Sequence, residues 1–158
     1  MIGSTHGATF PVTAQDTEVN ALVDSGAGKS CMSYDMYLTL DLPPIQERVL
    51  NVVGAQGGSL EPMGIVQCPF SISKKQFQSE FIVCRALRRP MVLGLDFWRK
   101  YAIGFMCTPR RTRKLFSNEE LLLEVDDHDQ VGIPIELKRA LRIPARTFMV
   151  ASLSLIHI

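Results

Sequence analysis

The chain has 158 residues, of which 46% are hydrophobic, and a formal net charge of +1. This length and composition predict one globular domain with a hydrophobic core and exclude an intrinsically disordered protein. The nearly balanced charge gives no reason to expect a nucleic-acid or membrane partner. No apolar stretch reaches the roughly 20 residues of a membrane span, and the first residues lack the features of a signal peptide, so an intracellular protein is expected.

Short strands separated by turns are predicted through the first two thirds of the chain. Residues 8–13 and 18–23 are apolar stretches on either side of the polar turn 14–17, which is typical of a β-hairpin. A single helix is expected at 96–101, after Gly94. Further strand patterns occupy residues 49–53, 60–70, 77–83 and 91–93. Many short strands with a single helix predict an all-β barrel or sandwich.

The composition changes after Cys107, where a basic run and an acidic run follow with few glycines. Three segments are therefore expected: an N-terminal segment at 1–7, a folded domain at 8–107, and a linker toward a downstream domain at 108–158. Within the linker, residues 121–123 have the pattern of a short strand. The last six residues, LSLIHI, resemble the translated end of a sequencing adapter, and they are set aside as an artefact in the fold prediction.

Four cysteines are far apart in the sequence and form no C-x-x-C pair with a nearby histidine. This spacing is not that of a zinc site. We predict that all four are reduced and largely buried thiols, with no metal and no cofactor: Cys31, Cys68, Cys84 and Cys107.

The segment LVDSGAGKS, at 22–30, has two interpretations. Its end, Gly28-Lys29-Ser30, matches the end of a phosphate-binding loop, but such a loop requires a glycine five residues before Gly28, where the chain has Val23. We therefore interpret this end as a polar turn with an exposed Lys29. Its start, Asp24-Ser25-Gly26, follows an apolar strand and places a carboxylate at a tight turn, where a glycine amide can approach it.

Three segments resemble the retroviral-type aspartic proteases (retropepsins), especially those of Ty3/gypsy-like retrotransposons, and they occur in the order typical of that family. ALVDSGAGKSCMS resembles the active-site segment. NVVGAQGGSLEPM, at 51–63, resembles the glycine-rich flap, and MVLGLDFWRKY, at 91–101, resembles the strand and helix that close the domain. The resemblance implies a retropepsin-like closed β-barrel with one short C-terminal helix and one lobe per chain. Residues 108–158 resemble the connector between protease and reverse transcriptase in such polyproteins.

The resemblance also implies a site. Asp24 would be catalytic, and because the chain has a single Asp-Ser-Gly or Asp-Thr-Gly triplet, it would meet Asp24 of a second copy in a homodimer. The active-site turn would comprise Ser25, Gly26 and Ala27. The flap would comprise Gly54, Ala55, Gln56, Gly57 and Gly58, and the wall of the substrate cleft would comprise Leu22, Val53, Val92 and Leu93.

The function implied is an aspartic endopeptidase that cleaves an extended peptide within a retroelement Gag-Pol polyprotein. Its partners would be a second copy and the substrate, with no metal, nucleic acid or membrane. The alternative is a catalytically silent domain of the same fold that acts in dimerisation or binding. A nucleotide-binding protein is a third interpretation, which the missing loop glycine disfavours.

Overall fold

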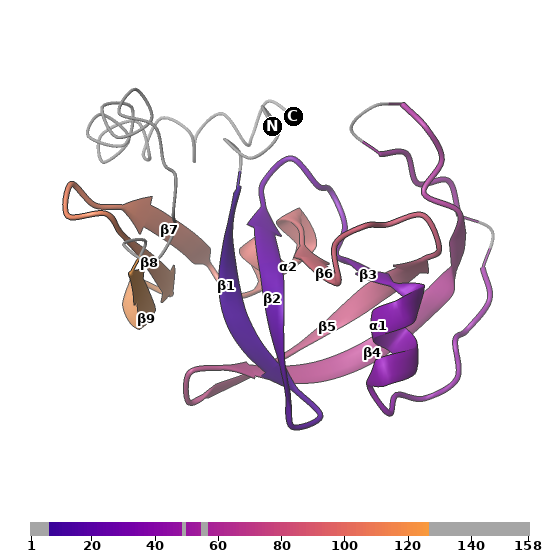
Figure 1. The fold of residues 1–158 in the computed structure, drawn as a ribbon, viewed down its shortest axis with the longest axis horizontal. Coiled ribbons are helices and arrows are strands. Elements are labelled where there is room, and N and C mark those ends of the chain that lie inside the picture. Colours follow the sequence, from indigo (N-terminus) through magenta and orange to yellow (C-terminus); the bar gives the residue numbers. More distant parts are fainter. Residues whose placement is uncertain (1–6, 49, 55–56, 127–158) are drawn as a thin grey trace. The chain divides into compact units, whose positions relative to one another are not determined.

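The computed structural model describes residues 7–48, 50–54 and 57–126. It divides after Phe97 into two compact units. The first unit contains a closed six-stranded barrel, and the second contains a three-stranded sheet (Figure 1). Within the described residues, no helix is long and apolar enough to cross a membrane.

The first hairpin of the barrel forms from the first two apolar stretches of the sequence. β1 (Gly7–Ala14) pairs with β2 (Thr17–Asp24) around a turn at Gln15 and Asp16. Both turn residues have positive φ angles, 48° and 61°, as in the tight turns that match the twist of a hairpin. The buried side chains of β2 are at alternate positions, Val19, Ala21 and Val23, so one face of this strand points into the core. The hairpin predicted from the sequence is confirmed.

A second, longer hairpin completes the wall of the barrel. β4 (Pro62–Ile72) pairs with β5 (Lys75–Cys84), and the two strands correspond to the patterns predicted at 60–70 and 77–83. In Figure 1 the two hairpins meet near their turns, where Thr13 of β1 pairs with Ser71 of β4. This single pairing closes the barrel.

Two short strands lie between the hairpins. β3 (Cys31–Ser33) runs parallel to β5, and β6 (Met91–Leu93) runs parallel to β2 and antiparallel to β3. The strand order is therefore β1-β2-β6-β3-β5-β4. This order places the segment that follows β2 beside the segment that follows β6, although the two are about 70 residues apart in the sequence. The β6 strand predicted at 91–93 is confirmed.

Four phenylalanines form the centre of the barrel core. The ring of Phe97 lies 5.6 Å from that of Phe70 and 5.5 Å from that of Phe77, measured between centroids. Phe70 also contacts Phe81 at 6.1 Å in an edge-to-face arrangement. Aromatic pairs at these separations add to the hydrophobic free energy of burial. Because Phe97 is in α2, the packing ties this helix to the hairpin β4–β5.

The sequence predicted one helix, and this is wrong because the described residues contain two. α2 (Leu95–Lys100) is the predicted C-terminal helix, whereas α1 (Tyr34–Thr39) was not expected. Ser33 caps α1, since its hydroxyl accepts a hydrogen bond of 3.1 Å from the backbone amide of Met36. α1 has no buried residue, so it lacks the apolar face by which a helix is recognised in a sequence.

The predicted strand at 49–53 is not formed by the residues that are described. Residues 50–52 are in no strand, and Val53 makes only an isolated bridge with Ser59. Among the described residues, the backbone of this segment pairs only with residues 58–60, through hydrogen bonds from Leu60 to Val52 and from Gly54 to Gly58. This ladder is too short to form a strand, whatever the β propensity of the segment.

The second unit is a small antiparallel sheet in the order β7-β8-β9. β7 (Ile103–Cys107), β8 (Thr112–Ser117) and β9 (Glu120–Asp126) follow one another along the chain. The strand predicted at 121–123 is confirmed as part of β9. The boundary expected after Cys107 falls within the β7–β8 hairpin, and residues 112–126 form strands rather than an irregular linker. Residues 127–158, including the last six residues, lie outside the described residues.

Candidate active site

Asp24 is the last residue of β2, and its carboxylate is held by the tight turn that follows. The backbone amide of Gly26 donates a hydrogen bond of 2.8 Å to Oδ1 of Asp24. The amide of Ala27 donates to the carbonyl oxygen of Asp24 at 3.3 Å. A side chain at position 26 would place its Cβ 3.2 Å from the same Oδ1, so glycine permits the close approach of the amide.

The alternation of β2 decides which way Asp24 points. Val23 is fully buried in the core, whereas Leu22 and Asp24 are half-buried and lie on the opposite face of the strand. Leu22 is paired in register with Val92 of β6. Leu22, Asp24 and Val92 all line one cavity. A strand that buries every second residue therefore places its terminal carboxylate in this cavity.

The loop after Asp24 is attached to the start of α2 by a group of hydrogen bonds, which we call the Ser30–Asp96 clamp. The hydroxyl of Ser30 donates to Oδ1 of Asp96 at 2.8 Å, and the amide of Ser30 donates to the same oxygen at 3.0 Å. The amide of Gly94 in turn donates to the hydroxyl of Ser30 at 3.0 Å. Oδ1 of Asp96 also accepts a hydrogen bond of 2.8 Å from the amide of Phe97, so this carboxylate joins the start of α2 to the loop after Asp24.

Gly94 is the closest contact between this loop and α2. A Cβ at this position would lie 2.7 Å from the carbonyl oxygens of both Ala27 and Lys29. Contacts this short to backbone atoms cannot be relieved by a rotamer change. The amide of Leu95 then donates to the carbonyl oxygen of Ala27 at 2.8 Å. The sequence Gly94-Leu95-Asp96 therefore holds the loop that follows the triplet Asp24-Ser25-Gly26.

The cavity beside Asp24 has a volume of about 730 Å³. This is the size at which proteins bind small molecules or a short stretch of peptide. Its wall is mostly apolar. It comes from four strands (β2, β3, β5 and β6), from the loop after β2, from the segment before β4, and from the connection between β5 and β6. The lining residues are Leu22, Asp24, Gly26, Ala27, Gly28, Lys29, Cys31, Leu50, Asn51, Val52, Val53, Gly54, Leu60, Ile82, Leu87, Arg89 and Val92.

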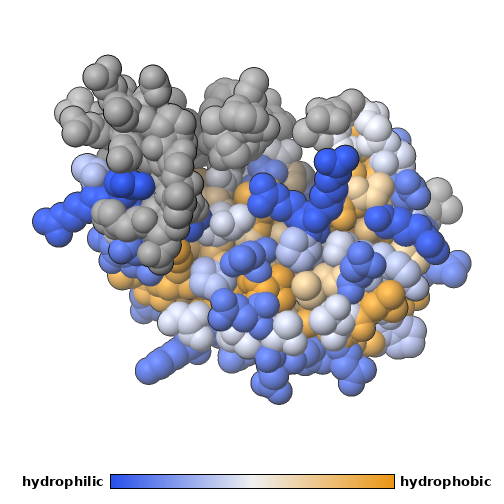
Figure 2. Space-filling model, viewed as in Figure 1, coloured by the Kyte–Doolittle hydropathy of each residue, from blue (hydrophilic) through white to orange (hydrophobic). Residues whose placement is uncertain are grey.

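The segment predicted as the flap contributes one side of this cavity. Val53 bridges Ser59, and the amide of Gly54 donates to the carbonyl oxygen of Gly58 at 2.8 Å, so the described part of the segment is a narrow hairpin. Gly57 has a φ of +88°, a conformation that favours glycine. Val53 is 55% exposed, and Leu38 and Leu121 are the other exposed large apolar side chains among the described residues. Figure 2 shows hydrophilic and hydrophobic residues interspersed over the visible face.

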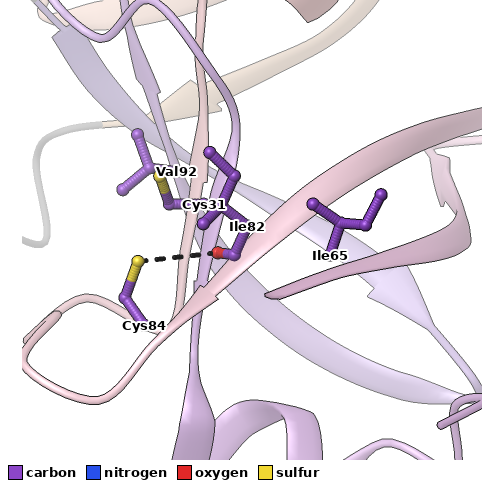
Figure 3. Close-up of a cluster of buried hydrophobic side chains, with 5 residues drawn as sticks. All are labelled: Cys31, Ile65, Ile82, Cys84 and Val92. Carbon is purple, nitrogen blue, oxygen red and sulfur yellow. Dashed lines mark hydrogen bonds between the residues drawn. The ribbon is translucent and has the colours of Figure 1, made fainter. Parts of the chain in front are cut away.

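Behind the cavity lies a small apolar cluster, drawn in Figure 3: Cys31, Ile65, Ile82, Cys84 and Val92. Cys31 and Cys84 come from the neighbouring parallel strands β3 and β5 and lie on one face of that pair, since Cys31 is in register with Ile82. The neighbouring side chain of Cys84, together with burial, raises the pKa of Cys31. The neighbouring side chain of Cys31 in turn lowers the pKa of Cys84, whose thiol donates to the carbonyl oxygen of Ile82 at 3.8 Å. At neutral pH Cys31 is therefore a protonated, apolar part of the cavity wall, and no disulfide is present.

The structure brings most of the predicted site residues together around this cavity. Leu22, Asp24, Gly26, Ala27, Val53, Gly54 and Val92 all line it, while Gly57 and Gly58 form the hairpin above the lining. Ser25 is 2% exposed and does not line it. Ala55 and Gln56 lie outside the described residues.

Leu93 is the predicted wall residue that the structure places elsewhere. It is fully buried in the core, because it follows Val92 in β6 and so points to the opposite face of the strand. Lys29, Arg89 and Leu87 line the cavity but were not in the predicted site. In the sequence, only their position could have indicated that these residues belong to the site: Lys29 is close to the triplet, and the other two precede β6. Within the described residues, no group of three metal-ligating side chains is found.

Comparison with known proteins identifies the family. The family model described as aspartyl protease matches residues 10–97, more than half of the chain. The chain belongs to the aspartyl protease family. The matched residues run from within β1 to the first half of α2, so they include all the other strands of the barrel and the whole of the cavity wall.

Solved structures show the same fold. The retroviral protease-like domain of Ddi1 from Leishmania major matches with a TM-score of 0.58 and 19% identity, over 81% of this chain and 98% of that domain. The EIAV protease, in complex with the inhibitor HBY-793, matches with a TM-score of 0.51 and 21% identity, over 60% of this chain and 86% of that protein. Among curated proteins, no relative matches. The predicted retropepsin-like barrel and family are confirmed.

Proposed function

We propose that the chain is an aspartic endopeptidase that acts as a homodimer, with Asp24 of each copy activating one water molecule. The observation that carries this proposal is the position of Asp24, whose carboxylate is held by the amide of Gly26 and lines the same cavity as the flap. The flap would close over an extended peptide and exclude water from the reaction. The peptide would bind as an added strand, with its side chains in alternating pockets.

The chemistry requires a second carboxylate, which the cavity of one chain does not supply. Asp24 is the sole acidic residue among those that line the cavity. Two carboxylates that share one proton provide a general base for the water and an acid that polarises the scissile carbonyl. Two like charges in contact cannot both ionise, so the pair titrates as a unit. A two-fold axis that passes beside Asp24 would bring the second carboxylate from another copy.

The substrate we propose is a retroelement Gag-Pol polyprotein. The active-site, flap and strand–helix segments resemble those of Ty3/gypsy-like elements in the same order, and residues 108–158 resemble the connector to reverse transcriptase. In such a polyprotein the protease is part of its own substrate, so activity that depends on dimerisation would delay cleavage until copies are concentrated.

Cleavage of an apolar peptide at mildly acidic pH, by the purified protein at high concentration, tests the proposal. Asp24→Asn should reduce kcat/KM by about 10³-fold, because general acid–base catalysis contributes roughly that factor. Its melting temperature should be unchanged, since an Asn side chain can still accept the hydrogen bond from Gly26. A statine-type inhibitor should abolish the wild-type activity.

Sedimentation measured on the same sample separates the two ways in which cleavage could fail. A monomer without activity would indicate that the missing step is dimerisation. A dimer that does not cleave would overturn the proposal and favour the alternative, a catalytically silent module of the same fold. Activity that Asp24→Asn retains would contradict the carboxylate mechanism.

A further inference from the structure

The cavity beside Asp24 carries two cationic side chains that the proposed chemistry does not use. Lys29 and Arg89 both line it, both are exposed, and Asp24 is the sole anion in the lining. Neither cation has an ion-pair partner among the residues that the structure describes. The whole chain has a net charge of only +1, so the excess of positive charge at this cavity is local and does not reflect a generally basic surface.

Lys29 is held in place by its neighbours in the active-site loop. Its carbonyl oxygen packs against Gly94 and accepts a weak hydrogen bond from the thiol of Cys31 at 3.6 Å. Ser30, the next residue, is fully buried and turns toward Asp96. Lys29 and Cys31, on either side of Ser30, both line the cavity, as expected where side chains alternate along an extended segment. The ammonium group therefore extends from an anchored backbone.

Arg89 is at the end of the connection between β5 and β6, and this connection is also attached to the barrel. The amide of Ala86 donates to the carbonyl oxygen of Leu60 at 3.0 Å, and the carbonyl oxygen of Pro90 accepts from Ser33 at 3.1 Å. Leu87, between these anchors, lines the apolar part of the same cavity. One short connection thus presents an apolar side chain and a cation to a bound ligand.

We propose that Lys29 and Arg89 select substrates in which acidic side chains flank the apolar residues at the scissile bond. This inference rests on the proposed peptidase function and specifies the substrate class of the same site. The apolar wall would accept aliphatic or aromatic side chains next to the cleaved bond. The cations would pair with Asp or Glu further along the extended peptide. Because a homodimer repeats each subsite across its two-fold axis, the acidic preference would occur on both sides of the bond.

Matched peptides test this selection within one enzyme. Two fluorogenic peptides share the same apolar centre and differ only in having Glu or the isosteric Gln at the flanking positions. Exposed ion pairs are individually weak, so we expect the Glu peptide to have a kcat/KM about fivefold higher at 50 mM salt. At 1 M salt, where the screening length is about 3 Å, the two peptides should become equal. Equal kcat/KM at low salt would overturn the inference.

Variants assign the preference to the two residues. The double variant Lys29→Gln/Arg89→Gln should reduce the Glu-to-Gln ratio to about one. Lys74→Gln makes a matched control, because Lys74 is exposed in the β4–β5 turn, at the other end of β4 from the flap, and does not line the cavity. Its ratio should stay at the wild-type value. A wild-type ratio in the double variant would overturn the inference.

A binding measurement separates failure of this inference from failure of the proposed function. Fluorescence anisotropy with Asp24→Asn reports the affinities of the same two peptides, labelled, without requiring cleavage. A Kd that is severalfold lower for the Glu peptide would support the selection even if the wild-type protein cleaves neither peptide. Equal affinities for the two peptides, or no binding of either at low salt, would overturn it.

Discussion

Ser30 is the residue whose replacement tests the Ser30–Asp96 clamp most directly. In Ser30→Ala, Asp96 loses a hydrogen bond of 2.8 Å from a hydroxyl that is fully buried, and the amide of Gly94 loses its acceptor. A hydrogen bond to a charged group contributes about 1.5–3 kcal/mol, and an unsatisfied buried donor costs about 1–3 kcal/mol. Since both terms arise from one hydroxyl, they do not add fully, and we expect a loss of about 3 kcal/mol in the free energy of unfolding.

Thermal unfolding gives the clearest readout of this loss. For a domain of roughly 100 residues, 1 kcal/mol shifts Tm by about 4 °C or more, so Ser30→Ala should lower Tm by at least ~12 °C. Ser79→Ala is the matched control. Ser79 is also a buried serine in the barrel unit, 6% exposed, but its hydroxyl has only a marginal hydrogen bond of 3.5 Å to the carbonyl oxygen of Glu80. Ser79→Ala should therefore lower the free energy of unfolding by less than ~1 kcal/mol.

The comparison between the two serine variants can refute the reasoning. If Ser30→Ala loses no more stability than Ser79→Ala, the clamp does not hold the active-site loop. If the proposed activity is present, kcat of Ser30→Ala should fall even at temperatures where the variant remains folded, because the loop after Asp24 loses the hydroxyl that joins it to Asp96 and Gly94 and keeps only its backbone hydrogen bonds to the start of α2. A full wild-type kcat would show that the loop is positioned by other contacts, such as the hydrogen bond from Leu95 to Ala27.

Two further predictions concern stability. Gly94→Ala should destabilise the fold by several kcal/mol, because its Cβ would lie 2.7 Å from backbone oxygens. The control Gly28→Ala should leave the stability nearly unchanged, because a Cβ at position 28 meets nothing within 4 Å. Equal midpoints of urea unfolding for the two variants would contradict this prediction. Burial raises the pKa of Cys68 from 9.0 to about 11, so between these pH values the unfolded chain loses a proton that the folded chain keeps. The free energy of unfolding should therefore fall as pH rises from 9 to 11. The fall should be less steep in Cys68→Ala, and identical slopes would exclude this cause.

The parts of the fold that the sequence predicted are those with a clear local signal, such as an apolar stretch, a polar turn or a glycine at a boundary. The hairpin β1–β2 shows two alternating stretches and a polar turn, and the helix α2 follows a glycine, so local rules sufficed for both. β3 has three residues, all of them buried, and it forms because β5 and β6 lie on either side of it. α1 has no apolar face and depends on the cap at Ser33. Short elements of this kind are specified by tertiary contacts, which single-sequence patterns do not contain.

The sequence predicted the candidate-site residues that belong to a motif. It did not predict those whose position depends on the register of paired strands. Asp24 and Gly26 were found because the triplet itself demands their geometry. Val92 and Leu93 are adjacent in an apolar strand, and only the pairing of Val92 with Leu22 decides which of them lines the cavity. Arg89 is 65 residues from Asp24 in the sequence, and it reaches the cavity because β6 is inserted between β2 and β3.

The two interpretations of LVDSGAGKS are separated by the partners of its backbone. A phosphate-binding loop works because its amides and its hydroxyl point at an anion. Here the amide and the hydroxyl of Ser30 both donate to the carboxylate of Asp96, and the amide of Gly26 donates to Asp24. Both sets of donors are thus already directed at negative charges of the protein itself, and a phosphate brought to them would be repelled. The side chain of Lys29 is exposed, at the edge of the cavity that the carboxylate of Asp24 also lines. The same residues that mimic a nucleotide motif therefore supply the rigid support of the triplet and, by our proposal, a subsite for an acidic side chain.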